Sequence, residues 1–270
     1  MQRNVHLGKR VLSMAAAAVL AVGCVALPIP APQAEPESTT LPYMDTSLSF
    51  EERAADLVSR MTLEEKVSQM GTNNPAVSRL GIAKYDFWTE CLHGVARLGK
   101  ATSFPYSIAM AASWDPAMIE EITDAISDEA RGYANGTGRG LSYFSPTINM
   151  ARDPRWGRDH ESYGEDPYLT GQIGTSFVKG LQGDDEKYLK VIATIKHYAA
   201  NNSEYNRHTG TSNMDDRTLR EYYTRAFKSV IQNVDVGSVM SSYNRVNGIP
   251  APGFAPMPRN AASLTLVDEL

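Results

Sequence analysis

Residues 191–198 read Val-Ile-Ala-Thr-Ile-Lys-His-Tyr, and residues 236–243 read Val-Gly-Ser-Val-Met-Ser-Ser-Tyr. Each is a short, largely apolar run that ends in polar or aromatic side chains, which is typical of a buried strand in a parallel sheet. Between them lies a helical pattern over residues 216–234, for which Asp215 or Asp216 is the expected N-cap. A strand, a helix and a second strand in this order predict one βαβ unit.

The same alternation of strand and helix continues on the N-terminal side of this unit. Further elements are predicted, in chain order, at residues 84–88 (strand), 116–133 (helix), 141–150 (strand) and 167–181 (helix). Asp115 and Asp166 each precede a proline and are expected to cap the two helices. Before the first strand, one helix is expected to begin at Ser49 and another at Thr62. The whole pattern predicts a parallel α/β fold.

The first residues have the pattern of an export signal. Three basic residues within the first ten precede an apolar run over residues 11–22, which is shorter than a membrane-spanning helix. A small residue precedes Cys24, as in bacterial lipoprotein signals, where that cysteine becomes the lipidated N-terminus. One alternative is cleavage after Ala26, which would release a soluble exported protein. Both of these signals predict a periplasmic, cell-surface or extracellular protein, and the first adds attachment to the membrane through lipidated Cys24. The other alternative is an apolar N-terminus that is coincidental and has no role in export.

The composition excludes some classes of partner. The 270 residues carry a net charge of −5, and their lysines and arginines form no basic stripe, which argues against nucleic acid. Apart from Cys24 the chain has only Cys91, so no internal disulfide is expected, and Cys91 is interpreted as a small buried residue. No cluster of residues has the spacing of zinc ligands, so neither a metal nor a cofactor is predicted. The sequence carries no signal for an oligomeric state.

Composition also divides the chain into four segments. Residues 1–24 are the predicted export signal, and residues 25–48, rich in Pro, Ala, Glu, Ser and Thr, are predicted to form a flexible linker. Residues 49–250 hold the predicted strands and helices. Residues 251–270 form a Pro-rich tail in which no strand is expected.

Polar side chains gather where the predicted strands end. Glu90 follows the first strand, Arg158 follows a later strand after a loop, Lys196 and His197 close a third strand, and Tyr243 closes a fourth. The carboxyl ends of parallel strands meet on one face of a sheet, where active sites are built. We therefore expect these side chains to form one site.

Four segments sharpen this interpretation. They are Trp88-Thr-Glu-Cys-Leu-His-Gly-Val-Ala96, Asp153-Pro-Arg-Trp-Gly-Arg158 with its continuation from Glu161 to Tyr168, Ile195-Lys-His-Tyr-Ala199, and Val239-Met-Ser-Ser-Tyr-Asn-Arg-Val-Asn-Gly248. In this order and spacing, residues 50–250 resemble the N-terminal barrel domain of glycoside hydrolase family 3, the β-xylosidase and β-glucosidase type. The Pro-rich tail over residues 251–270 departs from the family's pattern. The resemblance implies a TIM-type (β/α) barrel, N-terminal portion only, with about five of the eight strand–helix units.

The resemblance implies that six residues bind substrate, namely Trp88, Glu90, Arg158, Lys196, His197 and Tyr243. The charged residues and His197 would bind the hydroxyls of the glycone, the sugar unit that is released, through charge-assisted hydrogen bonds. Tyr243 would lie beside the anomeric carbon, and Trp88 would stack on the apolar face of the sugar ring. The Trp88-x-Glu90 pair is similar to the β-xylosidase branch, where the acid crowds the space that a hexose CH2OH group needs. A pentose is therefore favoured, and glucose stays open.

Other polar residues are given structural roles. Asp166 is interpreted as a helix cap rather than as half of a catalytic carboxylate pair. His93 is expected to bond the backbone beside Gly94, and His208 is expected to be solvated. Three further residues are expected to hold a long loop together rather than to contact substrate: Arg152, Asp153 and Arg155.

No catalytic residue is predicted in this chain. A retaining glycosidase needs two carboxyl groups about 5–5.5 Å apart. In the family the nucleophile is an Asp on the strand after the Tyr243 segment, and the acid/base follows later, whereas Asp268 and Glu269 here have no predicted strand to place them. One hypothesis is a truncated retaining β-glycosidase that is inactive by itself and acts on an oligosaccharide or glycoside in its full-length form. The alternatives are a non-catalytic carbohydrate-binding or vestigial surface lipoprotein, and a fragment that does not fold stably.

Overall fold

The computed structural model describes residues 40–253. The predictions for the export signal, for residues 25–39 of the linker and for residues 254–270 of the tail lie outside these residues. The chain divides into two compact units, Met1–Ser59 and Arg60–Leu270.

The first unit contains a short 3₁₀ helix, η1 (Pro42–Met44), in which Tyr43 is buried, and the start of α1 (Phe50–Arg60). The predicted start of α1 at Ser49 is confirmed. The Ser49 hydroxyl accepts a hydrogen bond from the Glu52 N–H (3.2 Å), and the Glu52 carboxylate accepts one from the Ser49 N–H (3.0 Å). This reciprocal pair satisfies two N–H groups that a helix start otherwise leaves without partners.

The second unit begins with short elements. They are α2 (Leu63–Ser68), β1 (Asn73–Asn74), η2 (Ser78–Leu80) and β2 (Tyr85–Asp86). The predicted cap at Thr62 is confirmed by a complete capping box with Glu65. The short strand predicted over residues 84–88 forms only as β2, and its expected place in the parallel sheet is wrong, because β2 pairs antiparallel with β1. The run carries charges at Lys84 and Asp86 and lacks the continuous apolar stretch that a strand buried on both faces needs.

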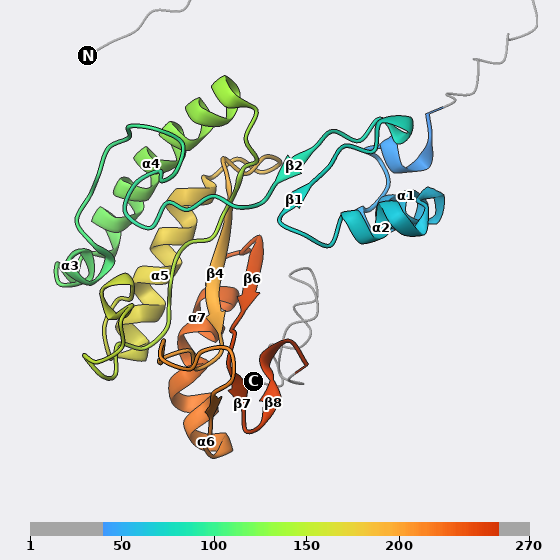
Figure 1. The fold of residues 1–270 in the computed structure, drawn as a ribbon. Helices are drawn as coiled ribbons and strands as arrows, with labels where there is room; N and C mark the ends of the chain where they lie inside the picture. Colours follow the sequence, from blue (N-terminus) through green and yellow to red (C-terminus); the bar gives the residue numbers. More distant parts are fainter. Residues whose placement is uncertain (1–39, 254–270) are drawn as a thin grey trace, which may run out of the picture. The chain divides into compact units, whose positions relative to one another are not determined.

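The centre of the second unit is a three-stranded parallel sheet (Figure 1). Its strands, in spatial order, are β3 (Ser142–Tyr143), β4 (Ile192–Tyr198) and β6 (Ser238–Ser241). The strands predicted over residues 191–198 and 236–243 are confirmed as β4 and β6; β4 is one residue shorter than predicted, and β6 is half the predicted length. Within residues 40–253 the parallel sheet is therefore open, since a closed barrel of this class needs eight strands.

The strand predicted over residues 141–150 is shorter than expected. Its ladder with β4 ends after Tyr143, and farther on Thr147 makes a single bridge to Lys196. Pro146 lies between these two pairings and has no N–H to donate, so it interrupts the ladder. The chain nevertheless continues along β4, because the Lys196 N–H donates to the Pro146 carbonyl (3.1 Å) and the Ile148 N–H donates to the Lys196 carbonyl (2.9 Å).

Helices follow β2, β3 and β4. They are α3 (Ser107–Ala111), α4 (Pro116–Thr137), η3 (Asp159–Glu161), α5 (Pro167–Gln182), α6 (Asp216–Thr218), η4 (Leu219–Tyr223) and α7 (Arg225–Asn233). The predicted caps are confirmed, since the Asp115, Asp166 and Asp215 carboxylates accept from N–H groups in the first turns of α4, α5 and α6. The helix predicted over residues 216–234 is divided by a π-helical turn, η4, after which Thr224 donates its hydroxyl to the Leu219 carbonyl (3.0 Å).

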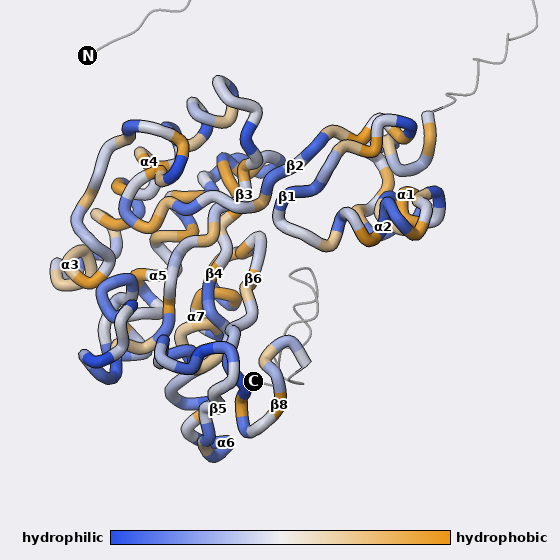
Figure 2. The backbone as a smooth tube through the Cα atoms, viewed as in Figure 1, coloured by the Kyte–Doolittle hydropathy of each residue, from blue (hydrophilic) through white to orange (hydrophobic). Residues whose placement is uncertain are grey.

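The apolar core lies where α5 packs against α4, α7 and β4 (Figures 1 and 2). Its largest fully buried side chains include Tyr143, Tyr163, Phe177, Tyr198 and Phe227. Gly180 lets α5 approach α4 closely, because a Cβ there would lie 2.2 Å from the Glu120 carbonyl oxygen. Packing of this kind, which removes apolar surface from water, stabilises the unit and positions the carboxyl ends of the strands.

A second small sheet ties together the segments that follow β4 and β6. Its strands are β5 (Thr211–Ser212), β7 (Arg245–Val246) and β8 (Ile249–Pro250), and η5 (Ala251–Gly253) follows them. β5 is parallel to β7, and β7 is antiparallel to β8. Among the described residues, no helix combines the length and the apolar character needed to cross a bilayer.

Candidate functional site

All six predicted site residues line one cavity of about 420 Å³. We call it the central cavity. Trp88 and Glu90 come from the segment after β2, Arg158 from the loop before η3, Lys196 and His197 from the end of β4, and Tyr243 from the segment after β6. The remaining lining residues are Thr72, Arg97, Phe144, Arg207 and Met240.

An irregularity in the sheet brings both Lys196 and His197 to this cavity. Successive side chains of a regular strand point to opposite faces. The pairing of β4 with β6 shifts between Lys196 and Tyr198, so that one residue of β4 has no counterpart in the ladder. Such shifts change the direction of a side chain, and here two consecutive polar residues line the same cavity.

His197 is buried and held in one tautomer. A guanidinium only donates, so the contact from Arg158 Nη1 to His197 Nε2 (3.2 Å) makes Nε2 an acceptor. Nδ1 then carries the proton and donates to Asn149 Oδ1 (3.0 Å), while the Asn149 amide donates to the His197 carbonyl (2.9 Å). Burial, and then the positive charge of Arg158, holds the pKa of His197 well below its usual 6.5. The imidazole is therefore neutral at pH 7.

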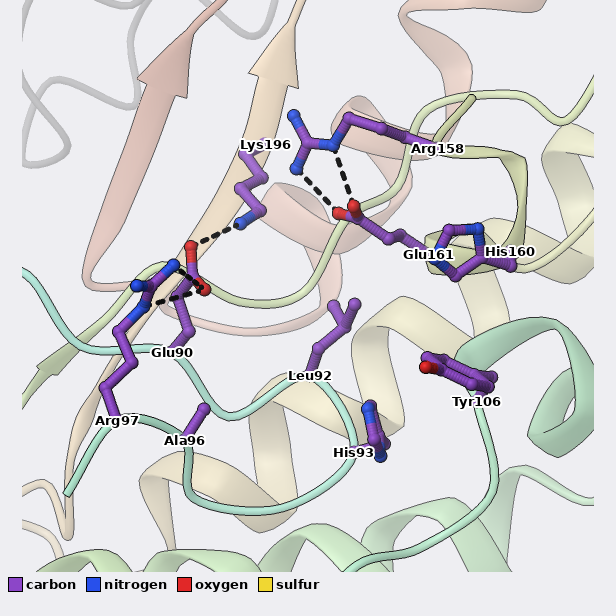
Figure 3. Close-up of a pocket in the computed structure, with 10 residues that line it drawn as sticks. All are labelled: Glu90, Leu92, His93, Ala96, Arg97, Tyr106, Arg158, His160, Glu161 and Lys196. Carbon is purple, nitrogen blue, oxygen red and sulfur yellow. Dashed lines mark hydrogen bonds and ion pairs between the residues drawn. The ribbon is translucent and has the colours of Figure 1, made fainter. Parts of the chain in front are cut away.

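Arg158 is clamped by Glu161. Its Nε and Nη2 donate to the two carboxylate oxygens of Glu161 at 2.8 and 2.6 Å, and both side chains are only 19% exposed (Figure 3). Burial raises the pKa of Glu161, but the hydrogen bonds and the charge of Arg158 outweigh that effect and leave the pKa lowered. Glu161 therefore stays ionised, and the bidentate pair fixes the guanidinium plane at the cavity.

Glu90 is shared by two cations. One carboxylate oxygen accepts from Arg97 Nε and Nη2 (3.3 and 3.2 Å), and the other lies 3.9 Å from Lys196 Nζ (Figure 3). Lys196 is almost buried, and burial lowers the pKa of its ammonium. The turn that carries Glu90 requires Gly94, which has a φ of +134° and where a Cβ would lie 2.1 Å from the Thr102 carbonyl oxygen.

Two half-exposed aromatic rings border the cavity. Trp88 is 50% exposed and lies under the Arg97 guanidinium, whose Cζ is 4.9 Å from the ring centroid. Tyr243 is 52% exposed and is covered in the same way by Arg207 (4.7 Å). His208 is exposed, as expected, and its ring also packs edge-on against Tyr243 with centroids 4.8 Å apart. The surrounding cations orient both rings.

The sequence-based predictions missed three charged residues of the site: Arg97, Glu161 and Arg207. Glu161 belongs to a quoted segment and lies three residues after Arg158, a spacing that could have indicated their ion pair. Arg97 and Arg207 lie in irregular segments, and no local pattern indicates that they cover Trp88 and Tyr243.

The structural interpretations of His93 and Cys91 are confirmed. His93 Nδ1 lies 3.0 Å from the Phe104 carbonyl oxygen. Cys91 is fully buried, and burial raises the pKa of its thiol to about 12, so it is no nucleophile. Asp153 forms an ion pair with Arg155, two residues away in the same loop. Within residues 40–253, no group of three or more His, Cys, Asp or Glu side chains is arranged to hold a metal ion.

The central cavity presents groups that suit a ligand with several hydroxyl groups. It presents donors from Lys196 and Arg158, acceptors from Glu90, and the exposed ring of Trp88. A hydroxyl can donate to one such group and accept from another, so a ring with adjacent hydroxyls could satisfy several of them together.

Comparison with known proteins gives one consistent family. The family model described as "Glycosyl hydrolase family 3 N terminal domain" matches residues 50–264. The chain is 44% identical over 229 residues to a xylan 1,4-beta-xylosidase of Xylanibacter ruminicola. This match covers 79% of this chain and 26% of that protein. It is 43% identical over 226 residues to beta-xylosidase/alpha-L-arabinofuranosidase 1 of Medicago sativa subsp. varia. This match covers 77% of this chain and 29% of that protein.

Two solved structures are similar as well. A GH3 exo-beta-xylosidase in complex with a xylobiose aziridine activity-based probe has a TM-score of 0.74 and 40% identity, covering 78% of this chain and 29% of that one. Beta-glucosidase 3B from Thermotoga neapolitana, in complex with glucose, has a TM-score of 0.64 and 31% identity, covering 73% and 30%. The chain spans between 26% and 30% of the length of these four relatives.

Proposed function

Because this chain belongs to glycoside hydrolase family 3, we propose that its central cavity binds the terminal, non-reducing β-linked sugar unit of an oligosaccharide or glycoside. The family consists of hydrolases that cleave O-glycosyl bonds. This chain would form the glycone-binding part of a retaining enzyme of that family. One observation carries the proposal. Six residues from four separate segments, singled out for sugar binding, line the same cavity.

Each of these groups has a distinct task in the proposed complex. Lys196 and the Arg158 guanidinium would donate to hydroxyl oxygens, and Glu90 would accept from hydroxyls on the same ring edge. The neutral His197 imidazole accepts a hydrogen bond from Arg158 and so helps to position the guanidinium. Asn149 fixes the His197 ring. Groups that are fixed before the ligand arrives lose little conformational entropy on binding, which favours affinity.

We propose xylose as the preferred sugar and glucose as the alternative. Arg97 and Lys196 hold the Glu90 carboxylate, which by the family resemblance would occupy the space that a hexose CH2OH group needs. Two named xylosidases are 44% and 43% identical to this chain, whereas the glucosidase from Thermotoga neapolitana is 31% identical. These identities support the same preference.

We further propose that this chain binds sugar without hydrolysing it. A retaining mechanism needs one carboxylate as nucleophile and a protonated carboxyl group as acid. The lowered pKa of Glu161 excludes it as the acid, and both of its carboxylate oxygens accept hydrogen bonds from Arg158. Glu90 is likewise engaged by Arg97. Because both carboxylates are engaged, a second candidate function is a carbohydrate-binding surface lipoprotein. In that case the predicted N-terminal signal would provide export and anchoring through Cys24.

Calorimetric titration of the chain with xylose and with glucose tests the proposal. Saturable heat is expected with xylose, more weakly with glucose, and no product is expected from aryl xylosides or aryl glucosides. Lys196→Met, which removes the charge and keeps the bulk, should weaken xylose binding by about tenfold, the equivalent of one charge-assisted hydrogen bond. Lys190→Met is the matched control, because Lys190 pairs with Asp124 and Asp128 outside the cavity.

Each contrary outcome has a different meaning. Absence of heat with both sugars would contradict sugar binding itself. If the chain hydrolysed the aryl glycosides and Lys196→Met abolished that activity, the proposed sugar site would stand. The proposal that the chain only binds sugar would be rejected. Equal affinities for xylose and glucose would reject the pentose preference alone.

A further inference from the structure

A small polar cavity of about 40 Å³ lies where the segment after β4 meets the segment after β6. Residues between positions 200 and 212 form its wall together with Asn244, and none of the described residues that line it is acidic. We call it the asparagine cavity. It shares Arg207 with the central cavity, and Asn244 directly follows Tyr243 in the chain.

Three amide side chains of this cavity are nearly buried, since Asn201, Asn202 and Asn244 are 1%, 8% and 5% exposed. Four of their polar atoms make no hydrogen bond to any described residue: Asn201 Oδ1 and Nδ2, Asn202 Oδ1, and Asn244 Oδ1. Buried polar atoms are normally paired, because leaving water without a new partner costs free energy. Three unpaired oxygens at one cavity therefore indicate a ligand that binds oxygen atoms.

The orientation of two of these amides is fixed by their nitrogen atoms. Asn202 Nδ2 donates to the Met150 carbonyl (2.6 Å), and Asn244 Nδ2 donates to the Ala199 carbonyl (3.2 Å). Rotating either amide by half a turn would bring its oxygen against a carbonyl oxygen, and both atoms would then be acceptors. In both residues Oδ1 is therefore the atom left for a ligand.

Neutral oxygen atoms of this kind are ligands for hard cations. Sites for Ca²⁺ normally include carboxylates, which offset its two positive charges, whereas carbonyl oxygens alone can replace the hydration shell of K⁺. The charge of Arg207 is offset by Glu204, since Arg207 Nη1 lies 2.9 Å from Glu204 Oε2. The 40 Å³ have room for one ion and about one or two waters, because a water needs about 10–15 Å³ of such volume.

We propose that the asparagine cavity binds one alkali-metal cation, sodium or potassium, through the amide oxygens of Asn201, Asn202 and Asn244. Asn201 Nδ2 cannot bind a cation and would donate to a water molecule beside the ion. The ion would tie the segment that carries Arg207 to the segment that carries Tyr243. The proposal does not depend on sugar binding in the central cavity.

Thermal denaturation in matched chloride salts tests the proposal. The chain is melted in sodium, potassium and choline chloride at equal ionic strength, because choline is too large for a cavity of about 40 Å³. A ligand that binds only the folded chain raises its stability. At about ten times the Kd of the bound ion, Tm should be about 3–6 °C higher than in choline chloride. The larger rise identifies sodium or potassium as the preferred ion.

Asn201→Ala should remove this rise. It deletes an amide that makes no hydrogen bond, so Tm in choline chloride should fall by no more than about 2 °C. Asn201→Asp keeps a ligand oxygen and adds a negative charge, so the rise should appear at a several-fold lower ion concentration. Asn233→Ala is the matched control and should keep the full rise, because Asn233 is exposed on α7 and does not line the asparagine cavity.

Equal Tm values of the unmodified chain in the three salts would overturn the proposal and leave the asparagine cavity to water alone. A rise that Asn201→Ala retains would overturn it too, because the ion would then act elsewhere on the chain. In that case any loss of stability in Asn201→Ala would be the same in all three salts, and Asn201 would have a structural role only.

Discussion

The helix–sheet interface and the loops at the carboxyl ends of the strands bury different kinds of side chain. At the interface, Ile126, Phe177 and Phe227 are fully buried among other apolar groups. In the loop region, Lys196 and His197 are almost as deeply buried, yet each is polar. Apolar burial stabilises without directional partners, whereas a buried polar group costs free energy unless a specific partner meets it.

A single strand passes from one environment to the other. Along β4, Ala193 and Ile195 belong to the apolar core, and Lys196 and His197, which follow directly, belong to the site. The interface therefore sets where the site is, and the partners of the polar residues set what it can bind. Stability and ligand affinity should accordingly respond to different substitutions.

The largest expected effect is on stability, from Phe177→Ala in α5. The ring is fully buried, so its loss should lower the free energy of unfolding by about 3–5 kcal/mol. Urea denaturation measures this change. Tyr168→Ala, in the same helix but 62% exposed, should change it by no more than about 0.5 kcal/mol. Under conditions in which Phe177→Ala is still folded, its affinity for xylose should be unchanged. A weaker affinity would contradict the independence of the helix–sheet interface and the loop region.

Glu161→Gln should affect both properties. It removes a charge-assisted pair that is 19% exposed on both sides, so unfolding should become easier by about 1.5–3 kcal/mol. Arg158 would lose its fixed orientation, and xylose affinity should fall about tenfold. Glu221→Gln is the matched control, because its pair with Arg217 is 62–82% exposed and should contribute about 0.3–0.5 kcal/mol. Equal losses in the two variants would show that burial of the Arg158 pair is unimportant.

The same division explains which features were predictable from sequence. The starts of α4 and α5 follow from Asp115-Pro116 and Asp166-Pro167, because a cap and a first-turn proline are local signals. β4 follows from its apolar run. Motifs in a fixed order indicated the six candidate site residues, and all six line the central cavity; their role in binding stays a prediction.

What could not be predicted depends on contacts distant in sequence. The pairing of β2 with β1 depends on which backbone groups meet in space, and the run over residues 84–88 says nothing of that. Arg97 covers Trp88 from nine residues further along, in an irregular turn, and Arg207 covers Tyr243 from another loop. Hydrophobic periodicity describes one helix or strand at a time, so it does not predict contacts between side chains of different loops.

The buried imidazole of His197 makes stability depend on pH. Its pKa in the folded protein is well below the 6.5 of an unfolded chain, so between these values only the unfolded chain binds the proton. The free energy of unfolding should therefore fall as pH is lowered from about 6.5, with up to about 1.4 kcal/mol per pH unit from this residue. His197→Gln should show a shallower fall in urea denaturation between pH 6.5 and 5. Parallel curves for the two proteins would contradict a neutral, buried His197.

The smallest effect on stability is expected at Arg97, where two contributions oppose each other. Its ion pair with Glu90 is 30–52% exposed and should contribute no more than about 1 kcal/mol. Its backbone has a φ of +68°, a left-handed conformation that is unfavourable for any residue with a Cβ and free for glycine. Arg97→Ala loses the ion pair and keeps the unfavourable backbone, whereas Arg97→Gly loses the ion pair and relieves the backbone.

Arg97→Gly should therefore match the unmodified chain in stability and exceed Arg97→Ala by about 0.5–1 kcal/mol in urea denaturation. Both variants should bind xylose several-fold more weakly and to the same extent, since both release Glu90 and remove the guanidinium that orients the Trp88 ring. A variant that keeps full stability and loses affinity would separate the loop region from the helix–sheet interface most sharply. If Arg97→Gly were as unstable as Arg97→Ala, the backbone at this turn would contribute nothing, and Arg97 would be retained for its ion pair alone.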